Sequence, residues 1–322
     1  MRIAMICLAV LGWLPSSPAD EPDLARLYRS ARQAAVEILV DGHHSGSGCF
    51  VSADGLVVSA AHVIGCPQRR IEVLTAAGER HLADVVAVDL GHDLIILQLT
   101  AGDRPHPFLR VADQLPPPGV PVWLCSSAAF RRVLLQPGTI ARADLTFEYQ
   151  DHFVEVTQIA AMIQEGTSGG PWLNRQGELI GVQSGTVTVK GQPAGIANVA
   201  PAAAVRRLLT TKEDARSTTL GMFVDELWLL SADELRRYPI GWEGMIVQSV
   251  KPDGPAAQAE IRRGDVIIAW EDTPLRYRDD FVRLLRNCQP GDTVQLTVFR
   301  PDNTGRRSVS IQIDCLEAAW SR

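Results

Sequence analysis

Short runs of apolar residues follow one another through the first two thirds of the chain. They span residues 36–40, 56–58, 71–74, 94–97, 120–124, 153–156 and 179–182. Turn residues such as Asp54-Gly55, Gly78 and Gly91 separate them, which is typical of β-strands. A parallel α/β sheet would need long helices between its strands, and no such helix is expected before about residue 201. The pattern therefore predicts all-β barrels or a sandwich.

Helical periodicity is confined to a few places. Leu24, Leu27 and Ala31 share one face of a short helix over 24–35, and a second helix is expected over 201–210. The stretch 211–218 is polar and aperiodic, and it reads as a linker.

The chain beyond the linker has a mixed α/β pattern. Ser231 to Glu234 fits a capping box. Residues Asp279 to Asn287 form an amphipathic helix that turns Phe281, Leu284 and Leu285 inward, and strands are expected over 294–299 and 309–313.

The first residues have the pattern of an export signal. Arg2 is followed by an apolar core from Ile3 to Leu14, and Ser17-Pro18-Ala19 offers small residues at a cleavage site. Residues 1–19 are therefore predicted to be a signal peptide, with a short membrane anchor or a buried helix as the alternatives. Export implies an oxidising compartment.

The cysteines leave disulfide formation open. Six are present, and Cys7 lies in the predicted signal. Of the other five, Cys49 with Cys66 and Cys288 with Cys315 are the candidate pairs, while buried free thiols are the alternative.

Composition excludes several classes of protein. The chain has 322 residues, 46% of them hydrophobic and 21% charged, which is ordinary for a globular protein of two domains. The net charge of −6 gives no basic field that would hold nucleic acid or an anionic membrane. No metal or organic cofactor is expected, because the adjacent His43 and His44 would point apart on an extended chain.

Three short motifs carry the candidate chemistry. His62 follows a predicted strand, Asp93 opens another, and Ser168 lies in the turn Gly166-Thr167-Ser168-Gly169-Gly170. A serine becomes nucleophilic when a base takes its proton and a carboxylate orients that base. The turn also fits the G-x-S-x-G pattern of α/β-hydrolases, but all seven histidines precede Ser168, so that order of residues fails.

With these motifs in view, the chain resembles the HtrA/DegP-type serine proteases, which have a trypsin-like protease domain followed by one PDZ domain. The likeness rests on Gly46 to Val51, Ser52 to Gly55, Asp93 to Leu97 and Gly195 to Pro201, besides the triad motifs. It implies a mostly β fold: a chymotrypsin-like double β-barrel over 20–210, the linker 211–218, an α+β PDZ domain over 219–315 and a tail over 316–322.

The resemblance also implies residue roles. His62, Asp93 and Ser168 would be catalytic, and the backbone N–H groups of Gly166 and Ser168 would form the oxyanion hole. Ser184 aligns with a position that hydrogen-bonds the triad acid, although an ordinary strand serine is the alternative. Met162, six residues before the nucleophile, would lie at the base of the S1 pocket and favour aliphatic side chains, unless it packs in the core.

The chain departs from the family pattern in places. Thr167 replaces the usual Asn, Gln164-Glu165 replaces Asn-Pro, and Ala160 replaces an upstream Asp. The loop from Asp41 to Ser45 is too short for the long regulatory insertion of some members.

In the second domain, Leu220, Gly221 and Met222 resemble the PDZ loop that captures a terminal carboxylate. The strand from Met222 to Glu226 would accept a peptide by β-augmentation, with the helix at 279–287 closing the groove. Glu260 stands where the family has Gly, so the turn there is expected to differ.

Together these features predict an exported serine endopeptidase, periplasmic or secreted. It would cleave misfolded or unfolded proteins through an acyl-enzyme and bind polypeptide C-termini at the PDZ domain. A peptide-binding chaperone with a weak or closed protease site is the alternative. The family also implies a homotrimer, with packing expected around Leu24 to Tyr28.

Overall fold

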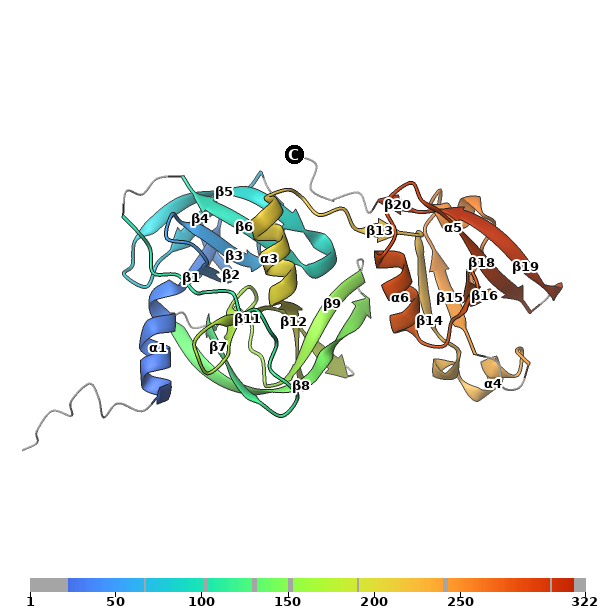
Figure 1. Ribbon diagram of the computed structural model, residues 1–322, viewed down its shortest axis with the longest axis horizontal. Coiled ribbons are helices and arrows are strands. Elements are labelled where there is room, and N and C mark those ends of the chain that lie inside the picture. The colour runs from blue at the N-terminus through green and yellow to red at the C-terminus, as the bar shows by residue number, and fades with distance from the viewer. Residues whose placement is uncertain are drawn as a thin grey trace, which may run out of the picture.

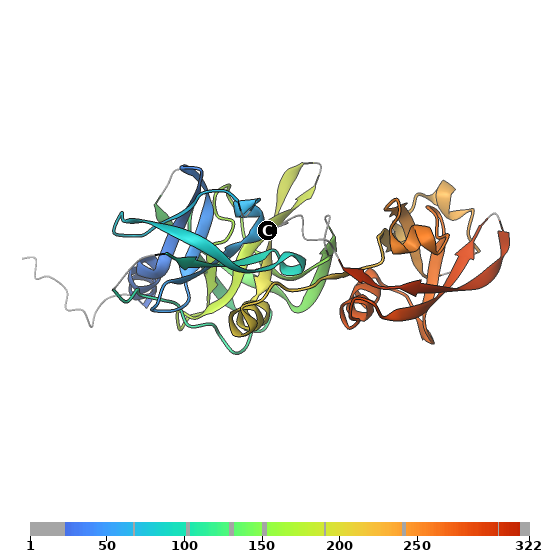
Figure 2. The same ribbon diagram turned by 90° about the horizontal axis from the view of Figure 1, so that it is seen from above.

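The structure is a computed structural model that describes residues 23–66, 68–100, 104–128, 132–149, 153–189, 191–239, 243–301 and 303–315. The predicted signal peptide and the tail over 316–322 lie outside these residues. A larger β-rich body carries the first part of the chain, and a smaller body carries the C-terminal part beside it (Figures 1 and 2). No helix among the described residues is long and apolar enough to cross a membrane.

The first half of the larger body is a closed six-stranded barrel in the order β1-β2-β3-β6-β5-β4. Its strands are β1 (Ala35–Val40), β2 (His43–Phe50), β3 (Leu56–Ala60), β4 (Ile71–Leu74), β5 (Arg80–Asp89) and β6 (Leu94–Leu99). All pairs are antiparallel, and valine, isoleucine and leucine side chains fill the interior. Two short helical turns, α2 (Ala61–Ile64) and η2 (Leu90–His92), interrupt the strands at one end.

A second closed barrel follows in the order β10-β11-β12-β9-β8-β7. Its strands are β7 (Pro121–Ser127), β8 (Val133–Tyr149), β9 (Phe153–Ala160), β10 (Pro171–Leu173), β11 (Leu179–Val189) and β12 (Gln192–Pro201). Trp172 is fully buried at its centre, and its ring N–H donates to Gln183 Oε1 over 2.9 Å. Gly138 makes room for this ring, because a Cβ there would lie 2.8 Å from it.

A separate apolar cluster joins the two barrels. It combines residues of β2, β3, β6, β7, β10 and β11 with the inner faces of α1 (Asp23–Ala34) and α3 (Ala202–Thr211). Leu27 packs in this cluster, and the Tyr28 hydroxyl donates to the carbonyl of Val133 over 2.9 Å. Leu27 and Tyr28 of the segment expected to pack in a trimer thus make contacts within one chain, while Leu24 and Arg26 are exposed.

The five described cysteines are all free thiols, so neither candidate pair is bridged. Cys49 and Cys125 lie buried in the cluster between the barrels. Burial raises the pKa of both thiols, that of Cys125 to about 12, which leaves them protonated and unreactive at neutral pH. Spacing along the chain therefore gave no guide to cysteine pairing.

The polar stretch after α3 is pinned to the first barrel. Asp214 Oδ1 accepts from the Val88 backbone N–H over 3.0 Å, and the Ala215 N–H donates to the Val88 carbonyl over 2.8 Å. The chain then forms β13 (Thr218–Thr219), which pairs with β20 (Asp314–Cys315).

The C-terminal body is one antiparallel sheet with short helices. The main path runs β14 (Met222–Glu226), β15 (Met245–Val250), β16 (Val266–Trp270), β18 (Thr293–Arg300) and β19 (Asn303–Gln312), and β17 (Thr273–Pro274) pairs with β16. Around it lie η3 (Leu227–Leu229), α4 (Ala232–Leu235), α5 (Pro255–Gln258) and α6 (Arg278–Arg286). In Figure 1, α6 lies on the side of this body that faces β8 and β9.

Most predicted elements are present, and the mostly β fold is confirmed. The capping box at Ser231 forms, with Glu234 bonding back to the Ser231 N–H. In α6, however, Val282 is fully buried beside Phe281 and Leu285, whereas Leu284 packs only at the edge of the core. Asp279 and Arg286 of the same helix form ion pairs with Arg142 and Glu155 of the second barrel.

The turn at Glu260 is left-handed. Glu260 has φ +56°, a conformation that costs a side chain about 1–2 kcal/mol and glycine much less. Its carbonyl accepts from Arg300 and from Arg307 over 2.8 Å each, which holds the strained turn in place.

Replacement of Glu260 by Gly is expected to stabilise the C-terminal domain. Relief of the left-handed strain should outweigh the backbone entropy of glycine, for a net gain of about 0.5–1 kcal/mol. Urea unfolding measures the gain. Glu260→Ala is the matched control: it removes the carboxylate but keeps the Cβ, so it should bring no stabilisation. Equal effects of the two substitutions would contradict a backbone origin.

Candidate active site

His62 and Asp93 meet at one end of the first barrel. Asp93 Oδ1 accepts from the His62 backbone N–H over 3.0 Å, and Asp93 Oδ2 lies 2.7 Å from His62 Nδ1. The Ala61 N–H also donates to the Asp93 carbonyl over 3.0 Å. The short helix α2, which directly follows β3, therefore fixes the imidazole against the carboxylate with its Nε2 side left for another partner.

Asp93 occupies a conformation that few side chains adopt. It caps η2 with φ +54°, and its side chain is only 15% exposed. Such a residue persists where the surroundings hold it, and strain of this kind gathers at functional sites.

Ser168 lies in a tight turn of the second barrel that docks on the first. Gly169 has φ +84°, and a Cβ there would come within 2.1 Å of the Ser47 carbonyl and 2.3 Å of Ser59 Oγ. Only glycine fits this contact between barrels. The Ser47 N–H donates to the Ser168 carbonyl over 2.7 Å, which fixes the height of Ser168 against the first barrel.

Ser184 joins the two halves of the site. Its hydroxyl donates to Asp93 Oδ2 over 2.5 Å, and its carbonyl accepts from Ser168 Oγ over 3.3 Å. The structure thus gathers Asp93, Ser168 and Ser184, and with them His62, where the two barrels meet. The Ser168 hydroxyl donates to a backbone carbonyl in this arrangement.

The segment before Ser168 is held by short polar contacts. Gly166 has φ +87°, and its carbonyl accepts from Ser47 Oγ over 2.9 Å. Thr167, in place of the family's Asn, is fully buried, and its hydroxyl donates to the Gln164 carbonyl over 2.7 Å. The Thr that replaces the family's Asn is therefore accommodated by a hydrogen bond within the loop.

Met162 lies at the surface. Its side chain is 66% exposed, and its sulfur would be 3.7 Å from a Cβ placed at Gly195 on the neighbouring strand β12. It does not pack in the core.

Ser47 is the residue that the sequence interpretation missed. It is fully buried and contacts the Ser168 turn through both its N–H and its hydroxyl. The motif Gly46-Ser47-Gly48 was the available signal, since a serine between two close-packed glycines marks a place where backbones approach.

Asp93 controls the charge of His62. Burial alone would lower the pKa of His62, but the hydrogen bond and the negative charge of Asp93 outweigh it and raise this pKa above its usual value. His62 is therefore a stronger base than a free imidazole, as a general base for a serine hydroxyl requires.

In the second domain, β14 stands first in the sheet order, so among the described strands it pairs on one side only, with β15. Leu220 is buried in the core and Met222 begins the strand. The Gly221 N–H donates to Thr219 Oγ1 over 2.9 Å, so in this state the loop satisfies that donor itself.

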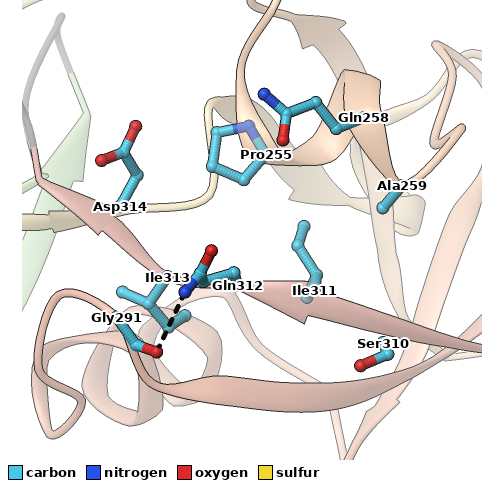
Figure 3. Close-up of a pocket in the computed structure, with 9 residues that line it drawn as sticks. All are labelled: Pro255, Gln258, Ala259, Gly291, Ser310, Ile311, Gln312, Ile313 and Asp314. Carbon is cyan, nitrogen blue, oxygen red and sulfur yellow. Dashed lines mark hydrogen bonds between the residues drawn. The ribbon is translucent and has the colours of Figure 1, made fainter.

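The hollow in Figure 3 is a different place. It lies between α5 and β19, and polar groups line it, with Gln312 donating to the Gly291 carbonyl over 3.3 Å. None of the three triad candidates borders it.

Comparison with known families accounts for both bodies. Residues 46–182 match the family described as Trypsin-like peptidase domain, and residues 212–313 match the PDZ domain family.

Named relatives match most of the chain. The chain is 30% identical over 313 residues to "Serine protease HTRA2, mitochondrial" of Bos taurus, covering 87% of this chain and 66% of that protein. It is 28% identical over 275 residues to "Probable periplasmic serine endoprotease DegP-like" of Brucella suis, covering 83% and 52%. The chain spans about half the length of the curated relatives it matches first.

Solved structures agree on the fold. "HtrA-type protease AlgW with decapeptide" superposes with a TM-score of 0.68 at 20% identity, covering 91% of this chain and 99% of that one. "Crystal structure of the serine endoprotease from Yersinia pestis" gives 0.65 at 24% identity, covering 94% and 100%.

Asp93→Asn is expected to lower the pKa of His62. The substitution removes the charge that favours the imidazolium and leaves the effect of burial, so protonation will occur at lower pH. An NMR titration of the His62 ring in both proteins measures the shift. Asp84→Asn, at an exposed position of β5, is the matched control and should leave the titration unchanged. A His62 pKa that stays put in Asp93→Asn would disprove the coupling.

Proposed function

We propose that this chain, an HtrA/DegP-type protein by its trypsin-like peptidase domain and its PDZ domain, is an exported serine endopeptidase that cleaves misfolded or unfolded polypeptides. The observation that carries the proposal is the assembly around Ser184. A base oriented by a carboxylate and a serine in a Gly-rich turn converge there from two barrels.

Each residue has a defined part in the reaction. Ser168 Oγ attacks the scissile carbonyl while His62 takes its proton, and His62 then protonates the leaving amine. The acyl-enzyme that remains on Ser168 is hydrolysed when His62 activates a water molecule. Asp93 keeps the His62 tautomer and stabilises its cation, and Ser184 holds Asp93 in turn.

The backbone N–H groups of Gly166 and Ser168 are proposed to stabilise the oxyanion, where one donor contributes roughly 2.7–4 kcal/mol. The exposed thioether of Met162 is proposed to receive the side chain before the cleaved bond. No carboxylate stands at that position to select Arg or Lys, so small and medium aliphatic residues such as Val, Ala and Leu are favoured.

The PDZ domain is proposed to bind polypeptide C-termini. The backbone around Leu220, Gly221 and Met222 would take the carboxylate, and the peptide would add to the edge of β14 beside α6. The Gly221 N–H would exchange its bond to Thr219 for one to the ligand. Several relatives are named as periplasmic, which supports export, and the homotrimer implied by the family is part of the proposal.

One observation favours the alternative, a peptide-binding chaperone with a closed protease site. The Ser168 hydroxyl donates to the Ser184 carbonyl, so its proton points away from the base. In the endopeptidase proposal, a bound substrate redirects this hydroxyl toward His62, because catalytic hydrogen bonds often tighten only in the complex.

Cleavage of reduced, unfolded casein tests the main proposal. Ser168→Ala is expected to lower kcat by about 10⁶-fold, which is below detection, because nucleophile and base act as a unit. The exposed Ser30→Ala is the control and should cleave normally. Equal and negligible cleavage by wild type and Ser168→Ala would refute the endopeptidase, and suppression of casein aggregation by both would favour the chaperone.

Sequencing of the casein products should give mainly Val, Ala or Leu at the residue before the cleaved bond. Dominant cleavage after Arg or Lys would refute the role of Met162.

Fluorescence anisotropy tests the PDZ proposal. A peptide ending in Val as a free acid is expected to bind at least about tenfold more tightly than its C-terminal amide, because only the acid offers a charged acceptor to the backbone N–H groups. The same peptide ending in Asp controls for charge alone and should bind weakly. Equal binding of acid and amide would exclude terminal-carboxylate capture. Leu220 is unsuitable as a variant, since it lies in the core.

A further inference from the structure

We propose that His92, which adjoins Asp93, is a positioning residue: its buried ring bridges the two barrels and holds the segment carrying Asp93 in its strained conformation. The proposal rests on the proposed function, because it assigns His92 an effect on the rate of cleavage. The family resemblance gives His92 no role, and the residue matters here because of what surrounds it.

Both ring nitrogens of His92 face carboxylates. Nδ1 lies 2.7 Å from Asp89 Oδ2, and Nε2 is hydrogen-bonded to Glu155 Oε2. Asp89 ends β5 in the first barrel, and Glu155 belongs to β9 in the second. The His92 side chain is 3% exposed, so water cannot take the place of either partner.

The two carboxylates are hydrogen-bond acceptors for the ring of His92. Burial alone would raise the pKa of the Asp89 and Glu155 carboxyls, but the hydrogen bonds and charge of His92, together with Arg286 and Arg207, lower both pKa values. Both carboxylates are therefore ionised at neutral pH, and each interacts with one ring nitrogen of His92.

Two arginines complete the cluster. Arg207 of α3 and Arg286 of α6 approach His92 Nε2 to 3.5 and 3.4 Å, and Arg286 also lies 3.8 Å from Glu155 Oε2. Their positive charges stabilise the two carboxylates and help to lower the pKa values of Asp89 and Glu155. The Arg286 guanidinium further donates to the Gly91 carbonyl over 2.5 Å, so the backbone beside His92 is held as well.

The cluster is built into the short helix that ends at the triad acid. The His92 backbone N–H donates to Asp89 Oδ1 over 3.1 Å, and the Asp93 N–H donates to the Leu90 carbonyl over 3.2 Å. His92 is thus the last residue of η2, and Asp93 is its left-handed cap. Because a strained residue persists only while its surroundings hold it, a loosened His92 releases the Asp93 carboxylate from His62.

The proposal predicts an effect at His62. When the Asp93 carboxylate is released, His62 loses the hydrogen bond and the negative charge that raise its pKa, so this pKa should fall. Because the base must be neutral to act, the acidic limb of the kcat profile reports the pKa of His62.

The pH dependence of kcat on saturating unfolded casein tests the proposal in wild type, His92→Gln, Glu155→Gln and the control His81→Gln. His81 lies in β5, 3.6 Å from the Glu79 carboxylate and away from the acid segment. His92→Gln should lower kcat at pH 7 by about tenfold or more, the scale of a hydrogen bond to a charged group, and move the acidic limb to lower pH. Glu155→Gln should move the acidic limb in the same direction, and His81→Gln should match wild type.

An acidic limb that is unchanged in His92→Gln would overturn the proposal, even if kcat falls uniformly. An NMR titration of the His62 ring in Ser168→Ala, with and without His92→Gln, gives a readout that does not need activity. A lower His62 pKa with His92→Gln is expected, and an equal pKa would overturn the proposal. Failure of wild-type cleavage, in contrast, would count against the endopeptidase and leave the NMR result to decide the role of His92.

Discussion

The site depends on one contact between the barrels, the hydrogen bonds that Ser47 makes to the turn of Ser168. His62 and Asp93 come from the first barrel and Ser168 from the second, so the distances among them depend on how the two barrels are placed against each other. Ser47 donates through its N–H to the Ser168 carbonyl and through its hydroxyl to the Gly166 carbonyl, while its Oγ accepts from the Ser127 N–H over 3.0 Å. A fully buried hydroxyl with these partners is costly to disturb, because a lost partner stays unsatisfied.

The sequence patterns predicted the features that depend on residues close to one another in the chain. Short β-branched runs, the triad motifs and the capping box at Ser231 depend on neighbours in sequence, and each is present in the structure. The long strands β5 and β8 were not predicted, because their polar residues break the apolar runs that signalled the other strands. Glu260 was flagged by the missing glycine, and the structure supplies the reason, a positive φ held by two arginines.

The remaining contacts could not be predicted from the sequence, because they join segments that are far apart along the chain. No residue near His92 in the sequence indicates its contacts with Glu155 and Arg286, and none near Ser47 indicates its contact with Ser168. The same limit applies to the cysteines, whose partners depend on distances in space rather than on spacing. It also applies to α6, whose Asp279 forms an ion pair with Arg142 of the second barrel at 3.3 Å.

The connection between the domains, which is hydrogen-bonded to the first barrel, bears on how the second domain would present a substrate. A flexible linker lets a binding domain sample a wide volume, whereas a rigid connection fixes its distance from the rest of the protein. Asp214 and Ala215 are bonded to Val88, and Arg286 and Asp279 anchor α6 to the barrels. If the second domain binds polypeptide ends as proposed, a chain end held beside α6 would lie at a fixed distance from Ser168. Polypeptides too short to span that distance would then gain nothing from the second domain, and the first cut would fall at a preferred distance from the held end.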